Sequence, residues 1–313
     1  MLVLSIQALN CAWSADLEKI KAKKRQNTMR IGKFNGFTLW TLSTKLPNYT
    51  VIKEYLWIFV RKFKNTMGLF SRVFGQSGSG PIQNEGFINT DMHSHLLPGI
   101  DDGVKNFAES LEVISAMHAM GYNKFITTPH IMSDFYRNSP EEIRSLCEEL
   151  RHELKKNNID VEVECAAEYY LDDHFEEELK AKSLMTFGDN YVLVETSYLN
   201  PANNFFEVLF NTRMGGYQPV LAHPERYVFM YDDFEKYKDI FERDVLFAIN
   251  LASFVGYYSK ESKRISEWLV KEKMVHFIGS DVHNVRLLPH FRNAFHSPAY
   301  KQCATLKLIN ESL

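Results

Sequence analysis

The sequence predicts an α/β protein whose main domain is a distorted, TIM-like (β/α)7 barrel of seven parallel strands. Seven apolar runs of strand length follow one another after residue 86, and segments of helical period lie between them. Such alternation favours a parallel sheet covered by helices. Histidine or carboxylate side chains come directly after these strands, and the carboxyl ends of barrel strands share one face. An open doubly wound sheet would scatter these side chains more widely.

The expected strands are short apolar runs with ligand-type side chains at their carboxyl ends. They span Phe87–Met92, Lys124–Thr128, Val161–Ala166, Tyr191–Val194, Gln218–Ala222, Leu246–Asn250 and Val275–Ile278. In the same order they are followed, or ended, by His93 with His95, His130, Glu168, Glu195, His223, Asn250, and Asp281 with His283. Separate strands that each deliver such a residue at the same end predict one shared site.

Helices are predicted between these strands from their period and their end signals. Apolar residues recur at three-residue steps in Ala108–Met120, as on one face of a helix. Pro140–Asn157 follows Ser139, a favourable N-cap, and begins with proline at the first helical position. Asn204–Met214 and Lys260–Lys273 have similar patterns. The helical segments complete the strand–helix units of the predicted barrel.

Charge divides the chain into unlike parts. Residues 1–74 contain 13 Lys/Arg against 3 Asp/Glu, whereas residues 75–313 contain 23 against 36. We interpret residues 1–66 as a basic extension that is poorly ordered or has no conserved function. Residues 67–85 form an amphipathic start and a Gly/Ser linker, and residues 86–313 form the catalytic domain. The acidic balance of that domain excludes nonspecific binding of nucleic acid.

Composition also narrows the compartment and the chemistry. The four cysteines form no CxxC pair and suggest no disulfide framework, which fits a reducing cytoplasm. No cysteine is followed six residues later by arginine, so the Cys-x5-Arg loop of cysteine phosphatases is missing. No apolar run approaches the roughly 20 residues that span a bilayer. The basic N-terminal segment leaves open a peripheral contact with anionic lipid.

Histidines and carboxylates in short strings indicate a metal site. In His93-x-His95, alternate residues on an extended backbone point to the same side, so both imidazoles can reach one ion. Asp281-x-His283 strengthens this signal, and the mixture of imidazole and carboxylate suits borderline divalent metals. Asp101-Asp102-Gly103 reads as a turn, but we expect Asp102 to be a ligand beside the histidine pair.

Further polar residues are candidates for metal ligands or for substrate binding. Glu168 and Glu195 each end an apolar strand, where a buried charge needs a partner such as a cation. Arg226 can bind a phosphate through its planar guanidinium, or can pair with an acid as a structural residue. Tyr136 and Arg137, on the loop after His130, are expected to clamp the substrate. The remaining histidines are assigned to the surface or the core.

These strings resemble the polymerase-and-histidinol-phosphatase (PHP) family of metal-dependent phosphoesterases. The resemblance is to its bacterial protein-tyrosine phosphatase branch, which dephosphorylates tyrosine kinases of capsule and exopolysaccharide synthesis. It rests on residues 91–103 (DMHSHLLPGIDDG), 127–130 (TTPH), 222–227 (AHPERY) and 280–283 (SDVH). It spans roughly residues 86–300 and does not cover residues 1–66.

The resemblance implies a PHP domain that holds two or three divalent metals, with manganese first and iron, cobalt or zinc as alternatives. The implied ligands are His93, His95, Asp102, His130, Glu168, Glu195, His223, Asp281 and His283. Arg226 is implied to orient the phosphate, and His223 or His283 could serve as an acid. The implied activity is that of a phosphoric monoester hydrolase, with a metal-activated water attacking phosphotyrosine in a bacterial tyrosine kinase.

Two other functions stay open at this point. One is a small-molecule phosphomonoesterase such as histidinol-phosphate phosphatase, although the branch-specific strings argue against it. The other is a non-catalytic metal-binding regulator that binds a partner kinase, although the complete ligand set argues against it. The sequence does not determine the oligomeric state or how the ligands divide among the metals.

Overall fold

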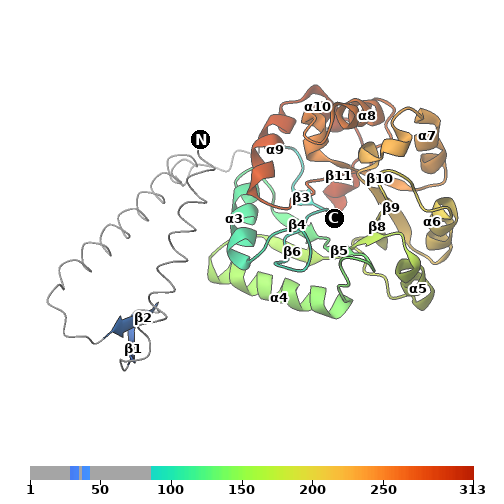
Figure 1. Ribbon diagram of the computed structural model, residues 1–313. Helices are drawn as coiled ribbons and strands as arrows, with labels where there is room; N and C mark the ends of the chain where they lie inside the picture. The colour runs from blue at the N-terminus through green and yellow to red at the C-terminus, as the bar shows by residue number, and fades with distance from the viewer. Residues whose placement is uncertain (1–28, 35–36, 43–85) are drawn as a thin grey trace, which may run out of the picture. The chain divides into compact units, whose positions relative to one another are not determined.

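The computed structural model describes residues 29–34, 37–42 and 86–313 (Figure 1). The chain divides into two units, Met1–Gly80 and Pro81–Leu313. In the first unit, β1 (Met29–Phe34) pairs antiparallel with β2 (Phe37–Leu42). The rest of the predicted extension 1–66, and all of the predicted segment 67–85, lie outside the described residues.

The strands of the second unit form two parallel sheets. They are β3 (Thr90–Asp91), β4 (Lys124–Thr127), β5 (His130–Ile131), β6 (Glu162–Cys165), β7 (Glu168–Tyr170), β8 (Tyr191–Glu195), β9 (Gln218–Ala222), β10 (Leu246–Asn250) and β11 (Phe277–Gly279). One sheet has the order β11-β10-β9-β8-β7-β5 and the other has the order β3-β4-β6. The mixed α/β class with parallel strands is therefore confirmed, but no closed barrel is seen in the described part of the chain.

The two sheets are separated by breaks in two of the predicted strands. The chain leaves β4 at Thr127 and enters β5 at His130, and it likewise leaves β6 at Cys165 and enters β7 at Glu168. Pro129 lies in the first break and has no N–H to donate to a ladder. Beyond the ends of β3 and β11, an isolated parallel bridge joins Ser94 to Val282, and the Asp281 amide donates to the His93 carbonyl at 2.8 Å. Local backbone chemistry thus interrupts the continuous sheet that the sequence predicted.

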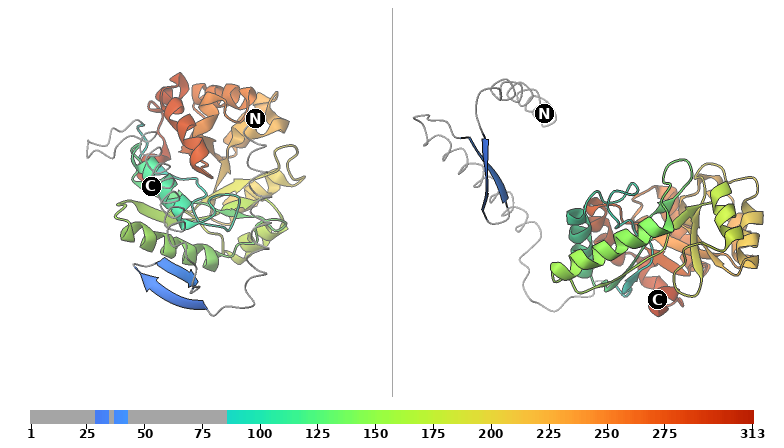
Figure 2. Two further views of the ribbon diagram at one scale, coloured as in Figure 1. Left: turned by 60° about the vertical axis from the view of Figure 1, so that its left-hand side comes forward. Right: turned by 90° about the horizontal axis from the view of Figure 1, so that it is seen from below.

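Helices surround the strands of this unit in each view (Figures 1 and 2). They are α3 (Phe107–His118), α4 (Pro140–Lys156), α5 (Asp173–Ala181), α6 (Phe205–Met214), α7 (Phe234–Glu242), α8 (Lys260–Lys271), α9 (Leu288–Phe295) and α10 (Pro298–Cys303). Short 3-10 helices are η1 (Pro224–Arg226), η2 (Val228–Met230), η3 (Leu251–Val255), η4 (Val285–Leu287) and η5 (Ile309–Ser312). Within the described residues, no helix is both long and apolar enough to cross a bilayer.

The four predicted helices are present as α3, α4, α6 and α8, with ends that differ by at most two residues. Ser139 caps α4 as predicted, because its side chain accepts a hydrogen bond from the Glu142 amide at 3.2 Å. The sequence analysis missed α5 and α7, which are only nine residues long. Asp172 and Asp233 cap them in the same manner, so a cap signal was available.

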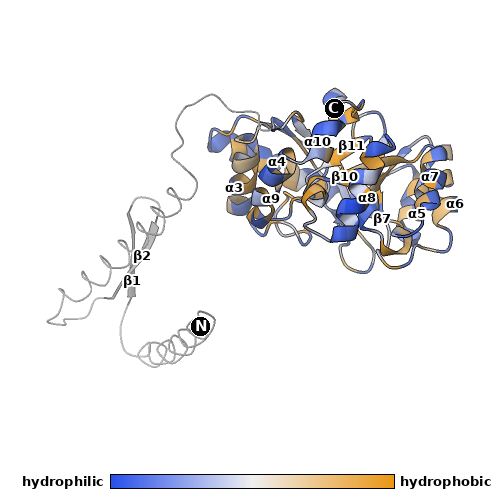
Figure 3. Cartoon of the chain, turned by 90° about the horizontal axis from the view of Figure 1, so that it is seen from above, coloured by the Kyte–Doolittle hydropathy of each residue, from blue (hydrophilic) through white to orange (hydrophobic). Residues whose placement is uncertain are grey.

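Two apolar clusters lie on opposite faces of the strands. The larger packs the helices against the strands and includes Phe125, Tyr169 and Phe247. The smaller draws buried side chains from all the predicted strands, including Leu193, Ala248 and Phe277, and contains no residue of helices α3 to α10. Figure 3 shows strand β11 as hydrophobic and helix α8 as largely hydrophilic. This second cluster forms the floor beneath the polar strand ends.

Candidate metal centre

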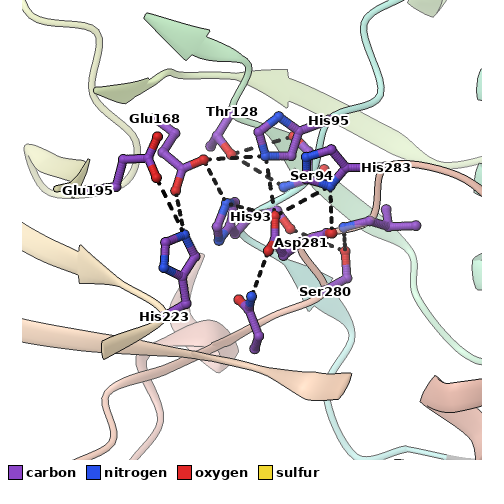
Figure 4. Close-up of polar contacts among 12 residues, drawn as sticks. His93, Ser94, His95, Thr128, Glu168, Glu195, His223, Ser280, Asp281 and His283 are labelled. Atoms are coloured by element: carbon purple, nitrogen blue, oxygen red, sulfur yellow. Dashed lines mark hydrogen bonds and ion pairs between the residues drawn. The ribbon is translucent and has the colours of Figure 1, made fainter. Parts of the chain in front are cut away.

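The carboxyl ends of the strands bring all nine predicted ligands into one cluster. Figure 4 labels these residues except Asp102 and His130. Four sets of side chains have donor atoms within 4.8 Å of one another. The sets are His95, Asp102, His130 and His283; His93, Glu168 and His223; His93, His95 and Asp281; and His130, Glu168 and Glu195. Because the sets share members, the side chains form one continuous group of donors, not separate sites.

Glu168, at the start of β7, lies at the middle of this cluster. Its Oε2 is 3.2 Å from His93 Nε2 and 3.4 Å from His95 Nε2. The same oxygen is 3.2 Å from His130 Nδ1, and Oε1 is 3.0 Å from His223 Nε2. The residue is only 1% exposed. One buried carboxylate that faces four imidazoles is suited to bridge two cations.

Asp281 provides the second buried carboxylate. Its Oδ1 is 3.5 Å from His93 Nε2 and 3.4 Å from His95 Nε2. Its Oδ2 turns the other way and accepts hydrogen bonds from Arg226 Nη1 at 2.8 Å and Asn250 Nδ2 at 2.6 Å. Asp281 therefore connects the histidine pair to the predicted phosphate-binding arginine.

Asp102, on the solvent side, and the buried Glu195 complete the cluster. Asp102 Oδ1 is 3.3 Å from His283 Nε2 and 3.5 Å from His130 Nε2, and its side chain is 54% exposed. The contact with His283 lowers the pKa of Asp102 to about 2. Glu195 Oε1 is 3.0 Å from His130 Nδ1 on the opposite side of that ring. The imidazole of His130 thus joins the inner and outer parts of the cluster.

Buried polar atoms in the centre lack hydrogen-bond partners from the protein. They are His93 Nδ1 and Nε2, His95 Nε2, His130 Nδ1, Glu168 Oε2 and His223 Nδ1. Each buried polar group without a partner costs about 1–3 kcal/mol. Divalent cations would satisfy Glu168 Oε2 and the ring nitrogens that face it, which are His93 Nε2, His95 Nε2 and His130 Nδ1. This mixture of donors suits manganese, iron or zinc. The residues therefore fit the metal group that the sequence predicted.

Electrostatics ties the protonation of these groups to metal binding. Burial opposes the charges of Glu168 and Asp281, but His93 and the other nearby imidazoles hold the pKa of both carboxyls well below the usual range. Burial likewise opposes a charge on His130, but Glu168 and Glu195 raise its pKa to about 9. Metal ligation requires a neutral imidazole, so cations and protons compete for the same nitrogens.

Two of the proposed ligands stand on strained backbone. His223 has φ 37° and Asp281 has φ 51°, in the left-handed region that residues other than glycine rarely adopt. Such strain costs of the order of 1–3 kcal/mol and persists where the surrounding structure holds it. Gly279 allows the close approach, since an added Cβ would lie 2.6 Å from the His93 Cβ. The backbone is bent here to direct side chains into the cluster.

The structure adds carboxylates that the sequence analysis did not assign. Asp101 Oδ2 lies 2.7 Å from His95 Nδ1 and accepts a hydrogen bond from the His130 amide at 3.2 Å. Asp91 accepts hydrogen bonds from the amide and hydroxyl of Ser280, at 2.8 and 2.6 Å, and thereby positions the loop before Asp281. Such outer partners orient metal-binding histidines. Asp101 belongs to the Asp101-Asp102-Gly103 turn, but the sequence did not show that Asp101 holds His95 while Asp102 is the candidate ligand.

Arg226 lies at the edge of the centre against two aromatic rings. Its guanidinium carbon is 4.0 Å from the centroid of Tyr258 and 4.7 Å from that of Tyr198. The Tyr258 hydroxyl also donates to Asp281 Oδ2 at 3.3 Å. The ion pair with Asp281 and these two rings fix the orientation of the planar cation. Neither tyrosine was identified from the sequence, because both are distant from Arg226 along the chain.

The two predicted substrate clamps have different surroundings. The ring of Tyr136 stacks on His130, with centroids 5.5 Å apart and an interplanar angle of 15°. Arg137 donates instead to the Ser133 carbonyl and lines a separate pocket of about 650 Å³ beside His174. The structure thus brings Tyr136 to the centre and shows no contact between Arg137 and the nine clustered side chains.

The parallel strands end in a buried cluster of imidazoles and carboxylates. This fold and site are those of α/β proteins with a metal centre of the hydrolase type. The family model for capsular polysaccharide synthesis, CpsB/CapC, matches residues 89–305. The match covers more than half of the chain, which therefore belongs to this family. The family resemblance that was stated from the sequence is confirmed.

Relatives of known name are phosphatases. Tyrosine-protein phosphatase YwqE of Bacillus subtilis is 30% identical over 63% of this chain and 78% of its own length. Tyrosine-protein phosphatase CpsB of Streptococcus agalactiae is 28% identical over 64% of this chain and 85% of its own length. A solved structure from a study of YwqE and of CpsB from Streptococcus pneumoniae, described as metal-dependent tyrosine phosphatases, matches with a TM-score of 0.62. That match has 28% identity and covers 71% of this chain and 94% of the solved chain.

Proposed function

We propose that this protein is a metal-dependent tyrosine phosphatase that hydrolyses phosphotyrosine in proteins with a metal-activated water. One observation carries the proposal: nine imidazole and carboxylate side chains converge on one cluster, and buried nitrogens and oxygens in five of them have no hydrogen-bond partner in the protein. The family membership and the names of the relatives support the same activity. The proposed substrate is a bacterial tyrosine kinase of capsule or exopolysaccharide synthesis.

The nine clustered residues would hold two or three divalent ions, manganese first. Glu168 would bridge two of them, because its two oxygens face different imidazoles. Bound ions would supply a water of lowered pKa and positive charge for the phosphate oxygens. Asp101 holds the His95 ring, and Asp91 holds the Ser280 loop, so the ligands meet the ions without large rearrangement.

Arg226 orients the phosphate and balances charge on its non-bridging oxygens. Asp281, Tyr198 and Tyr258 hold the guanidinium in place, so little conformational entropy is lost when the phosphate binds. The leaving phenolate has a pKa of about 10, so it needs less protonation than an alkoxide. His283, with 20% of its side chain exposed, is better placed to donate this proton than buried His223, whose pKa is lowered by burial.

We further propose that residues 86–313 form the phosphatase domain and that the two sheets are parts of one distorted seven-stranded barrel. The breaks at residues 128–129 and 166–167, and the bridge between Ser94 and Val282, support this interpretation. The basic extension 1–66 is proposed to be unnecessary for catalysis. Phosphatase activity of a variant that lacks residues 1–66 tests this point.

Phosphate release from a phosphotyrosine peptide tests the proposed activity. The purified protein is assayed with Mn, Co, Zn and Mg, and its metal content is measured by elemental analysis. His93→Ala is expected to abolish release and to lower the metal content, whereas the exposed His152→Ala is a matched control. Equal rates for wild type and His93→Ala would contradict the proposal, and so would a preference for histidinol phosphate over the peptide.

A further inference from the structure

Exposed apolar side chains fall into two groups within the described residues. Phe206, Phe210 and Met214 lie at four-residue steps along α6. The others lie singly in the segments between strands β5, β8, β9 and β10 and the α-helices that follow them. They are Phe135, Leu199, Val228 and Tyr257, which are 76%, 66%, 48% and 43% exposed. Val228 begins η2, and Tyr257 comes after η3. The strands before these segments each end in, or lead into, a residue of the metal centre or its support.

Each of these four side chains is the direct chain neighbour of an aromatic residue at the centre. The neighbours, in the same order, are Tyr136, Tyr198, Tyr227 and Tyr258. Tyr136 stacks on His130 at 5.5 Å, and Tyr198 and Tyr227 have ring centroids 5.5 and 5.8 Å from that of His223. Tyr258 lies against Arg226. Four loops therefore repeat one arrangement: an inner ring beside the centre and an outer apolar side chain in water.

The loops are also joined to one another. The Val228 amide donates to the Tyr198 carbonyl at 2.8 Å, so the loops after β8 and β9 are hydrogen-bonded at their apolar tips. Arg226 lies between Tyr198 of one loop and Tyr258 of another. These contacts join the segments after β8, β9 and β10 at the carboxyl ends of the strands, where the metal centre lies, and Tyr136 joins the fourth segment to His130 of the same centre.

We propose that Phe135, Leu199, Val228 and Tyr257 form an apolar collar that binds apolar side chains flanking the phosphotyrosine in a polypeptide substrate. This inference rests on the proposed phosphatase function and adds which residues next to the phosphotyrosine the enzyme prefers. These four side chains leave carbon surface in water beside a charged site, and a bound polypeptide would remove that surface from water. The phosphate enters the metal centre, the aromatic ring lies beside the inner tyrosines, and the neighbouring residues of the polypeptide reach the collar.

Charge and size distinguish this occupant from a small phosphomonoester. A small polar substrate fills the centre and leaves the collar in water, so it gains nothing from these four side chains. A polypeptide removes apolar surface from water on both sides of the phosphate, at about 25 cal/mol per Å². Selection then falls on the residues next to the phosphotyrosine and not on the ring alone.

The test compares two double variants of the full chain. Leu199→Ser with Val228→Ser removes half of the collar, and Phe210→Ser with Met214→Ser makes the matched change on α6. Each is assayed with a phosphotyrosine peptide that has leucine on both sides, with the same peptide flanked by serine, and with phenyl phosphate. The measured quantity is the ratio of kcat/KM for the leucine-flanked peptide to kcat/KM for phenyl phosphate.

The collar variant is expected to lower this ratio about tenfold, and the α6 variant should keep the wild-type ratio. An unchanged ratio in the collar variant overturns the proposal, and so does an equal fall in the α6 variant. A wild type that hydrolyses phenyl phosphate without preferring leucine over serine flanks contradicts the collar alone. Absence of hydrolysis of all three compounds contradicts the proposed function, and the collar with it.

Discussion

The same strands carry two contrasting regions, an apolar floor and a polar metal centre. The floor contains Leu193, Ala248 and Phe277, which are buried among other carbon atoms. Two residues further along β8 and β10, the chain places Glu195 and Asn250 on the same face. Alternation along a strand fixes which face of the sheet a side chain occupies. Position along the strand then decides whether that side chain packs in the apolar floor or belongs to the metal centre.

His223 is an exception that makes the point sharper. His223 directly follows Ala222 of the floor, so regular alternation would turn it to the other face of β9. Its left-handed backbone, at φ 37° and ψ 54°, directs the imidazole back to the centre. The floor uses unstrained strand geometry, whereas the centre includes strained residues. Stability and chemistry are thus separated along a few residues of each strand.

The largest expected effect comes from breaking the middle of the centre. Glu168→Gln removes the charge that faces four imidazoles, so we expect kcat to fall by about 10³-fold or more and the metal content to drop. Rate assays and elemental analysis measure both. The control is Glu164→Gln on β6, the preceding strand in the chain, whose carboxylate pairs with Lys124 at 2.7 Å. Full activity of Glu168→Gln would remove the basis for a bridging carboxylate.

Breaking the floor should have the opposite result. Phe277→Ala removes a fully buried ring that contacts Phe187 and Tyr191 edge to face. We expect the free energy of unfolding to fall by about 3–5 kcal/mol, with kcat of the folded protein changed only a few-fold. Urea unfolding measures the first effect. Phe210→Ala, at a ring that is 62% exposed, should change stability by less than about 0.5 kcal/mol.

A buried histidine outside the metal centre should make the folded protein less stable in acid. His276, before β11, accepts a hydrogen bond from the Phe247 amide at Nδ1, and burial lowers its pKa from 6.5 to about 4. The unfolded chain binds this proton at a higher pH than the folded protein, so stability falls as pH drops through that window. We expect its contribution to cost roughly 2 kcal/mol between pH 7.5 and pH 5.

A variant separates this effect from the titration of the metal ligands. His276→Gln keeps a hydrogen-bond acceptor without a titrating group, so its stability should decline less between these pH values than that of the wild type. The exposed His152→Gln is the control and should follow the wild type. Identical pH dependence for His276→Gln and wild type, by urea unfolding, would exclude this role.

The smallest expected effect concerns the support of Arg226. Tyr258→Leu removes the ring under the guanidinium and the hydroxyl on Asp281, and should lower kcat/KM about tenfold, mainly through KM. Tyr258→Phe keeps the ring and should recover most of this loss. Steady-state kinetics on a phosphotyrosine peptide give the split. A loss that Phe does not recover would assign the effect to the hydroxyl instead of the ring.

Local signals in the chain were sufficient for much of the fold. The apolar runs located the strands, and proline with a serine cap located the start of α4, because these depend on neighbours in sequence. The short helices α5, α7, α9 and α10 were missed, since tertiary packing supports such short helices more than their own period does. The closed barrel was expected from the count of units, and the breaks at the ends of β4 and β6 were not.

The sequence by itself determined which residues could bind metal. Residue type and position at the end of an apolar run can both be read from the chain, and they identify imidazole and carboxylate side chains as possible ligands. Only the tertiary structure decided how they meet. It selected Glu168 for the middle, placed Asp101 behind His95, and set Tyr198 and Tyr258 against Arg226. These contacts join residues far apart in the chain, and their geometry depends on strand register and strained backbone that no local pattern encodes.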